Sequence, residues 1–271
     1  MLRPSQASVH THGGNPCNSS RTSEFVYYMA HIENAAKIIN WGLFAHKWAS
    51  SLPFRREIAD NDVMGNRQKF WGFVNLYFGT HTAMQWVLEI DEEDLVFIRF
   101  PSDEIFRGHG AKFSDGNVAS NYSMVYEASS QSTELSSLDW PIILCMKNYF
   151  GDSAKRKKMS EMLVPNYIPS SMIHSAVVLN QGAEKRLREM IQSKTDTTYL
   201  EATKKIFAEM SRSGIKFSFP NETRFSHQEG PFQIISPNYG KCKIIRDRKR
   251  EHFFSHGDGE DPSGPSYRIR F

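Results

Sequence analysis

Apolar residues in this sequence gather in short runs separated by polar segments. Several runs combine β-branched, aromatic and aliphatic residues over a length typical of strands. The predicted strands are 25–29, 73–78, 95–100, 161–164 and 172–179. Pro101 and Pro165 directly follow two of these runs and are expected to end the strands, because proline has no N–H to donate to a neighbouring strand.

Other apolar residues recur at intervals of three and four, which predicts amphipathic helices. Asn34 is expected to cap the first helix, whose apolar face holds Ala35, Ile38 and Ile39, and Gly42 is expected to end it. Further helices are predicted at 140–149, 183–192 and 199–210, with short ones near 61–69 and 84–88.

The order of these elements predicts an α+β fold, with short strands separated by loops and helices. Residues 1–23 are polar, which is typical of a flexible leader and not of a signal peptide. One folded domain is expected over 24–213. Residues 214–271 are rich in Gly, Pro, Ser, His and basic residues, and are expected to form a partly disordered extension. Within the domain, 121–138 has the polar composition of a loop.

Composition and charge narrow the function only slightly. The 271 residues are 39% hydrophobic and 13% aromatic, which is enough for a core, and the formal net charge is +3. Basic residues cluster at 155–158 and 241–250. Such clusters can neutralise phosphates, and a solvated helix face or a basic tail has the same pattern.

The cysteines argue for a reducing compartment. Cys17, Cys145 and Cys242 are widely separated and form no CxxC pair, so no metal site is expected. No apolar run approaches the length of a membrane-spanning helix, and a cytoplasmic protein without a membrane partner is predicted. The motifs GxGxxG, GxxxxGK[ST], HExxH and GxSxG are absent, so any nucleotide must be held in another way.

Six short segments together resemble a known family. They are 31–34 with 38–43, 56–60 with 63 and 66–68, 74–78 with 84, 95–97, 113–120, and 160–165 with 168–169 and 173. In this order and at compatible spacing, they resemble the DarT family of DNA ADP-ribosyltransferases, the toxins of a toxin–antitoxin system. The resemblance covers about residues 24–192.

The resemblance implies an ADP-ribosyltransferase fold, with bent, split β-sheets around an NAD cleft and peripheral helices. It implies transfer of ADP-ribose from NAD+ to thymine or guanine in single-stranded DNA, with release of nicotinamide. The implied partner is an antitoxin that hydrolyses the ADP-ribosyl mark. The composition leaves two alternatives open, namely the same chemistry on protein or RNA, or an inactive module that binds nucleic acid through 215–271.

The resemblance also assigns candidate site residues. Glu161 is implied as the catalytic carboxylate, which would stabilise the positive charge that develops on the ribose. Arg67 is implied to act at the acceptor base and on the NAD phosphates, although a guanidinium is a poor base. The implied NAD contacts are His31, Ile32, Glu33, Asn40, Trp48 and Arg67.

Four further features of the sequence are candidates for DNA contact. Tyr122, Tyr126 and Trp140 can stack on unpaired bases, and the basic run 155–158 can hold the DNA backbone beside Glu161. Each has a structural alternative, since aromatic residues usually fill core space.

Overall fold

The computed structural model describes residues 23–53, 65, 67–79, 92–128, 133–144, 151–193, 197–215 and 233–236. Several predictions lie outside these residues, wholly or in part. They are the leader 1–23, the short helices near 61–69 and 84–88, and the basic run 241–250.

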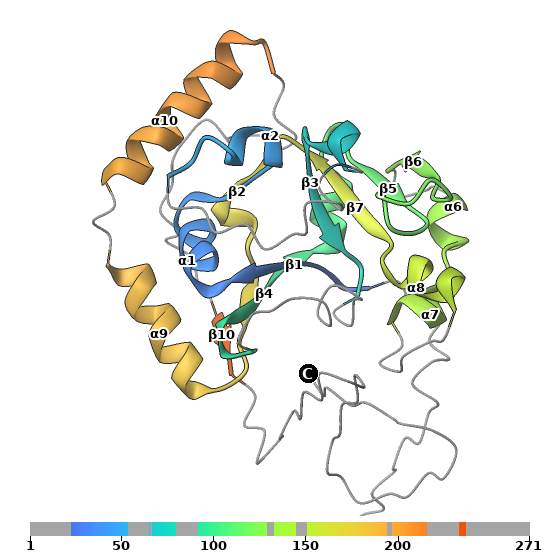
Figure 1. The fold of residues 1–271 in the computed structure, drawn as a ribbon, viewed down its shortest axis with the longest axis horizontal. Coiled ribbons are helices and arrows are strands. Elements are labelled where there is room, and N and C mark those ends of the chain that lie inside the picture. The colour runs from blue at the N-terminus through green and yellow to red at the C-terminus, as the bar shows by residue number, and fades with distance from the viewer. Residues whose placement is uncertain are drawn as a thin grey trace, which may run out of the picture.

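The described residues build a mixed α+β fold around a large, mostly antiparallel sheet (Figure 1). Its strand order is β10 (Gln233–Ile235), β9 (Ser175–Val177), β4 (Leu95–Pro101), β1 (Phe25–His31), β3 (Phe73–Tyr77), β7 (Glu161–Pro165), β5 (Lys112–Ser114) and β6 (Val125–Glu127). The pair β10–β9 is parallel, and the other neighbours are antiparallel. A second sheet pairs β2 (Leu43–Phe44) with β8 (Tyr167–Ile168).

Helices pack against the sheet and beside its ends. They are α1 (Ile32–Trp41), α2 (His46–Ala49), α5 (Ser102–Phe106), α6 (Thr133–Ser136), α7 (Trp140–Leu144), α8 (Asp152–Lys158), α9 (Gln181–Gln192) and α10 (Thr197–Arg212). Single 3-10 turns are η1 (Gln68–Phe70), η2 (Glu92–Asp94) and η3 (Ser170–Met172). In Figure 1, α9 lies beside α1, and α6, α7 and α8 gather near β5 and β6. None of the helices that the structure describes is long and apolar enough to cross a membrane.

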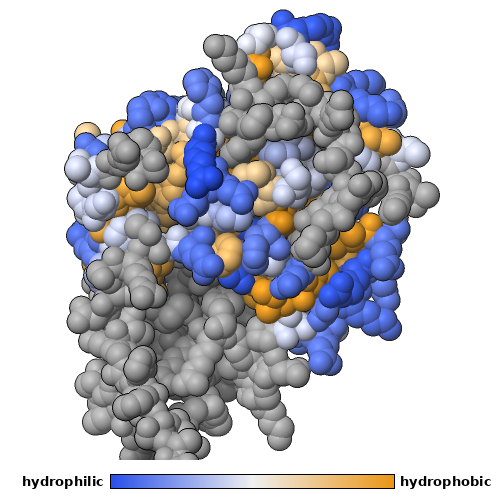
Figure 2. All heavy atoms as spheres, turned by 180° about the vertical axis from the view of Figure 1, so that it is seen from behind, coloured by the Kyte–Doolittle hydropathy of each residue, from blue (hydrophilic) through white to orange (hydrophobic). Residues whose placement is uncertain are grey.

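The core lies between the central strands and α1. Alternate residues of β4, namely Val96, Ile98 and Phe100, are fully buried, as the period-2 pattern of a strand requires. Helix α1 buries Ile32, Ala35, Ala36, Ile38 and Ile39. On the outer surface, seen from behind in Figure 2, apolar residues gather in a band that hydrophilic residues border.

The first helix begins earlier than the sequence predicts. It starts at Ile32, and its cap is His31 instead of Asn34, because the Nδ1 atom of His31 accepts a hydrogen bond from the N–H of Glu33 at 3.3 Å. Strand β1 therefore runs directly into α1. Gly42 ends the helix as predicted, with φ of 85° and an N–H that donates to the carbonyl of Ile38 at 2.7 Å.

Two other regions differ from the prediction. The strand expected over 172–179 forms only at Ser175–Val177, since 170–172 is a 3-10 turn. The loop expected over 121–138 contains β6 and α6. Strand β6 forms because its backbone pairs with β5, with Tyr126 opposite Phe113, and such a short pairing leaves little trace in the hydrophobic pattern.

Candidate active site

Glu161 is the first residue of β7, an interior strand of the sheet, and its side chain is completely buried. Its Oε1 atom accepts a hydrogen bond from Nη2 of Arg67 at 2.5 Å. Its Oε2 atom accepts one from Nδ2 of Asn75 at 2.7 Å. Both carboxylate oxygens are thus held, which fixes the orientation of a group that would otherwise be costly to bury.

Arg67 directly precedes η1, and its side chain is 15% exposed. Besides Glu161, its Nη2 atom lies 3.5 Å from Oδ1 of Asn117. Its Nε atom is buried and has no hydrogen-bond partner among the described residues. The structure therefore joins two candidate residues that are 94 positions apart in the sequence, and it leaves one donor of the arginine unused.

Burial and the ion pair act in opposite directions on the protonation of this cluster. Burial raises the pKa of Glu161, while Arg67 and the hydrogen bond from Asn75 oppose that shift. Burial alone would lower the pKa of Arg67, but the negative charge of Glu161 and the neighbouring Tyr77 oppose that effect, and the pKa lies above its ordinary value. Burial also raises the pKa of Tyr77, which faces Glu161 across the β3–β7 pair. The arginine consequently remains a cation, and the tyrosine keeps its proton near neutral pH.

A cleft opens beside this cluster. Arg67, Asn75 and Tyr77 line one part of it, so that Glu161 lies directly behind its wall. Other lining residues come from β1, α1, the β2–α2 region, η1, β3 and α10; they are Tyr28, Met29, Asn34, Lys37, Ile38, Gly42, Leu43, Phe44, His46, Ala49, Leu52, Phe70, Trp71, Phe73, Val74 and Tyr199. The cleft therefore offers aromatic and cationic groups next to a buried carboxylate.

The tripeptide His31-Ile32-Glu33 lies at the junction of β1 and α1. His31 is buried, and its Nε2 atom is 3.7 Å from a carboxylate oxygen of Asp94. Ile32 is in the core and Glu33 is exposed. Met29 and Asn34, which lie on either side of the tripeptide in the sequence, line the cleft, whereas His31, Ile32 and Glu33 do not. The structure thus places this tripeptide at the edge of the cleft but apart from Glu161.

Asn40 and Trp48 are engaged in packing. The Nδ2 atom of Asn40 donates to the carbonyl of Ile191, which ties α1 to α9. The indole of Trp48 is buried, and its Nε1 atom donates to Oδ1 of Asn166 at 3.0 Å. Neither residue lines the cleft. Their polar groups hold the walls of the cleft in place.

The candidate DNA contacts differ in exposure. The side chain of Tyr122 is 85% exposed, whereas Trp140 is buried and donates its Nε1 hydrogen bond to Leu135. Tyr126 is partly buried and stacks on Phe113, with ring centroids 5.3 Å apart. Of the three aromatic candidates, Tyr122 alone presents its ring to solvent.

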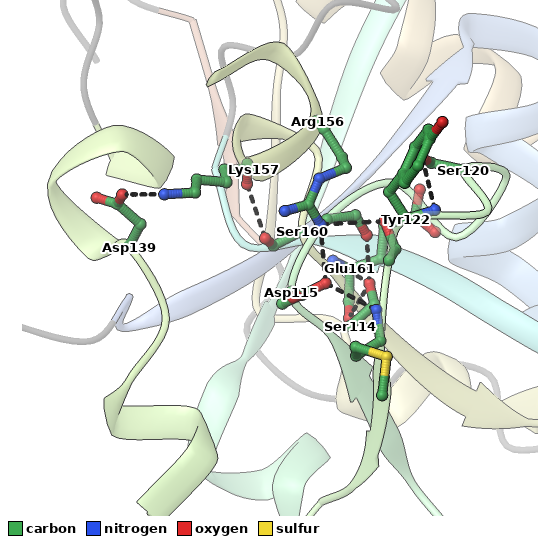
Figure 3. A network of polar contacts seen from close by, with 12 residues as sticks. Ser114, Asp115, Ser120, Tyr122, Asp139, Arg156, Lys157, Ser160 and Glu161 are labelled. Atoms are coloured by element: carbon green, nitrogen blue, oxygen red, sulfur yellow. Dashed lines mark hydrogen bonds and ion pairs between the residues drawn. The ribbon is translucent and has the colours of Figure 1, made fainter. Parts of the chain in front are cut away.

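The basic run 155–158 is largely used inside the molecule. Arg156 pairs with Asp115 at 3.0 Å, and Lys157 pairs with Asp139 at 2.9 Å (Figure 3). Lys158 is buried, which lowers its pKa to about 8. Lys155 is exposed. The run therefore braces α8 against its surroundings, and two of its four side chains form ion pairs within the molecule.

Sequence reasoning missed four residues that surround Glu161. They are Asn75, Tyr77, Ser114 and Asn117. A signal existed for Asn75, because it interrupts the apolar run 73–78 as a polar residue on an interior strand. Ser114 and Asn117 lie within the segment 113–120 that carries part of the family resemblance. Among the described residues, no group of His, Cys, Asp and Glu is arranged to hold a metal ion.

Comparison with known proteins identifies the class to which this fold and site belong. A family model described as "ssDNA thymidine ADP-ribosyltransferase, DarT" matches residues 27–208. This segment includes Arg67, Glu161 and the neighbouring strands β3, β7 and β5. The chain belongs to the DarT family.

Individual relatives are distant in sequence. A DNA ADP-ribosyl transferase–DNA ADP-ribosyl glycohydrolase fusion protein of Thermosipho africanus is 24% identical over 183 residues, which are 62% of this chain and 46% of that protein. This chain therefore spans less than half the length of that relative.

Two solved structures share the fold. Thermus sp. 2.9 DarT in complex with ADP-ribosylated ssDNA is 20% identical, with a TM-score of 0.57, and the match covers 64% of this chain and 91% of that one. Thermosipho africanus DarTG in complex with ADP-ribose is 23% identical, with a TM-score of 0.54, covering 63% and 48%.

Proposed function

We propose that this chain transfers ADP-ribose from NAD+ to a base of single-stranded DNA and releases nicotinamide. Thymine is the base named in the description of its family. The observation that carries the proposal is the buried carboxylate of Glu161, held by Arg67 and Asn75 at the wall of a cleft. The Thermus relative, whose structure contains ADP-ribosylated ssDNA, supports DNA as the acceptor.

Glu161 acts on the donor. When the bond between nicotinamide and ribose breaks, the electron pair leaves with nicotinamide and positive charge develops on the ribose. A fixed carboxylate stabilises that charge, and it costs no reorganisation because its hydrogen bonds are already in place. Its burial strengthens the interaction, since little water screens it.

Arg67 acts at the acceptor and not as a base. Its raised pKa keeps the guanidinium charged, so it cannot take the proton that the DNA base loses. A guanidinium instead stabilises the negative charge that appears on a base as it deprotonates. The buried Nε–H is a donor still without a partner among the described residues, and it is suited to a carbonyl or phosphate oxygen of a substrate.

The cleft is the proposed NAD+ site. His31, Ile32 and Glu33 begin the helix whose next turns line it, and they contact the co-substrate at the edge of the cleft. The geometry supports an indirect contribution from Asn40 and Trp48, which hold α1 and α2. We assign no step to a metal.

The partners follow from the same chemistry. Single-stranded DNA is the proposed acceptor, because a base within a duplex is shielded from a protein cleft. An antitoxin that removes the mark is the second proposed partner, and the fusion of transferase and glycohydrolase in the Thermosipho relative supports it. The sparse cysteines favour the cytoplasm as the location.

The test is to incubate the chain with labelled NAD+ and an equal mixture of single-stranded DNA, RNA and protein. Label is expected on DNA, and mass spectrometry of its nucleosides identifies the base. Glu161→Gln preserves shape and should lower the rate by about 100-fold or more. Label on protein alone overturns the proposal. DNA binding without nicotinamide release supports the inactive module instead.

A further inference from the structure

The loop between β5 and β6, residues 114–124, is tied to the catalytic strand at its base. The Oγ atom of Ser114 accepts a hydrogen bond from the backbone N–H of Glu161 at 3.1 Å. The same hydroxyl donates to the carbonyl of Gly116 at 2.6 Å. Both groups are buried, so the first turn of the loop is fixed with respect to the backbone of Glu161.

Arg156 ties the loop to α8 from the other side. Its Nη1 atom donates to Oδ1 of Asp115 at 3.0 Å and lies 3.4 Å from Oγ of Ser123. Its backbone carbonyl accepts from the N–H of Asn117 at 3.1 Å. Figure 3 shows Arg156 beside Asp115, close to Ser114 and Glu161. The arginine therefore contacts the loop near both of its ends, at Asp115 and Ser123, and at Asn117 between them.

The packing between Arg156 and the loop is close. A Cβ added at Gly116 would lie 2.7 Å from Cγ of Arg156 and 2.9 Å from Oγ of Ser123. The side chain of Arg156 is 20% exposed and that of Asp115 is 29% exposed, so their ion pair is partly shielded from solvent. Such a pair is worth more than one on the open surface.

The loop carries Asn117 to the catalytic arginine. The Oδ1 atom of Asn117 accepts from the N–H of Ala119 at 2.9 Å, which fixes the direction of the amide, and it lies 3.5 Å from Nη2 of Arg67. The Nδ2 atom faces Sδ of Met159 at 3.7 Å. Asn117 and Glu161 thus share the same end of the guanidinium.

We propose that Arg156 is a positioning residue for the transfer step. It holds the 114–124 loop so that Asn117, together with Glu161, orients the guanidinium of Arg67. This inference rests on the proposed function. Arg156 does not line the cleft, so its loss disturbs the orientation of Arg67 more than the binding of NAD+. The charge of Arg156 then holds the loop through Asp115, and contact with DNA phosphates is not its main role.

The experiment measures steady-state transfer to single-stranded DNA by the full chain and by Arg156→Ala, Asn117→Ala and the double variant. Each single variant is expected to lower kcat about tenfold, with KM for NAD+ changed less than about twofold. Because Arg156 acts through Asn117, the double variant should be no slower than Asn117→Ala. Arg156→Lys should recover part of the rate.

Arg188 supplies the matched control. It forms a more exposed ion pair with Glu184 on α9, at 2.7 Å, and Arg188→Ala should leave transfer unchanged. Thermal melting of each variant separates lost positioning from lost folding. If Arg156→Ala unfolds, the kinetic measurement is made with Asp115→Asn instead. That substitution removes the same ion pair with little change of shape.

Three results would overturn the inference. One is wild-type kcat in both Arg156→Ala and Asp115→Asn. Another is a double variant whose loss is the product of the two single losses, since independent residues behave in that way. The third is an effect confined to KM for DNA, which would make Arg156 a phosphate contact. A wild-type chain that transfers nothing to DNA overturns the proposed function itself, and this inference with it.

Discussion

At the scale of single residues, the site depends on hydrogen bonds that compensate burial. Glu161 is fully buried and receives one hydrogen bond at each carboxylate oxygen. Burial favours the protonated acid, whereas the donors favour the carboxylate that the proposed chemistry requires. The balance between these effects is expected to set the pH range of the proposed transfer.

Asn75→Leu is expected to raise the lower pH limit of activity. The hydrogen bond from Asn75 stabilises the charged form and lowers the pKa of Glu161. Its removal raises that pKa, so the acid limb of the activity profile moves to higher pH. A profile of kcat/KM against pH measures the shift. An unchanged acid limb, or one that moves to lower pH, contradicts the assignment of that limb to Glu161.

Lys158→Met is expected to stabilise the fold. Burial lowers the pKa of Lys158 to about 8, from 10.5. The folded chain therefore binds this proton more weakly than the unfolded chain, and the resulting penalty is full below pH 8 and disappears toward pH 10.5. The variant should gain about 1–3 kcal/mol in the free energy of unfolding at pH 7, and the gain should shrink as the pH rises from 8 toward 10.5.

The exposed neighbour provides the comparison for that measurement. Lys155→Met changes the same charge in the same helix, and should alter stability by less than about 0.5 kcal/mol. Denaturant unfolding at pH 7 and pH 10 gives both values. A Lys158→Met variant less stable than the wild type at pH 7 would show that the contacts of the lysine outweigh its burial.

At the scale of elements, the end of helix α1 depends on one residue and on its packing. Gly42 ends α1 with φ of 85°, and a Cβ at this position would lie 2.6 Å from the ring of Tyr167. The hydroxyl of Tyr167 donates to the carbonyl of Trp41 at 2.9 Å. The glycine therefore serves both the backbone turn and the contact between α1 and β8.

Gly42→Ala should cost more than the backbone strain alone. Gly214, which follows α10, also has a positive φ of 64°, but no atom lies within 4 Å of a Cβ added there. Gly214→Ala should therefore cost about 1 kcal/mol, and Gly42→Ala about 2–4 kcal/mol. Equal losses of unfolding free energy in the two variants would contradict the close contact with Tyr167.

The sequence predicts the long strands and helices well, and the short elements poorly. The apolar runs 73–78 and 95–100 and the helical spacing in 183–192 and 199–210 are strong signals, and the structure confirms elements at each. Strand β6 and helix α6 escape prediction because partners distant in the sequence determine them. His31 as a cap was also missed, since histidine seldom has that role.

The same reasoning applies to the site. Family resemblance led to Glu161 and Arg67, and the structure places them in contact. It could not reveal that Asn75 and Asn117 complete the cluster, or that Arg156 turns toward Asp115. Those contacts depend on strand register and loop shape, which a single sequence does not encode in any local pattern.

At the scale of the whole molecule, part of the expected carboxy-terminal extension belongs to the sheet. Strand β10, residues 233–235, pairs in parallel with β9, and Ile234 is buried in the main core. The carbonyl of Ile235 accepts a hydrogen bond from the N–H of Val178 at 3.0 Å. The extension is therefore not wholly separate from the domain expected over 24–213.

Ile234→Ala should lower the stability of the entire domain. The loss of a buried isoleucine side chain costs about 2–4 kcal/mol, and Gln233→Ala on the same strand, where the side chain is exposed, should have little effect. Calorimetry should give one transition that shifts as a whole. A shift restricted to a separate, minor transition would mean that β10 is independent of the catalytic unit.

The position of β7 has a consequence for how the proposed toxin is made. This strand lies between β3 and β5, both of which come earlier in the chain. A product of interrupted translation that stops before residue 161 would contain Arg67 and Asn75 but neither the carboxylate nor the strand that joins the two parts of the sheet. Chains that end before residue 161 are therefore expected to lack the proposed transfer activity, which requires that β7 has been inserted between β3 and β5.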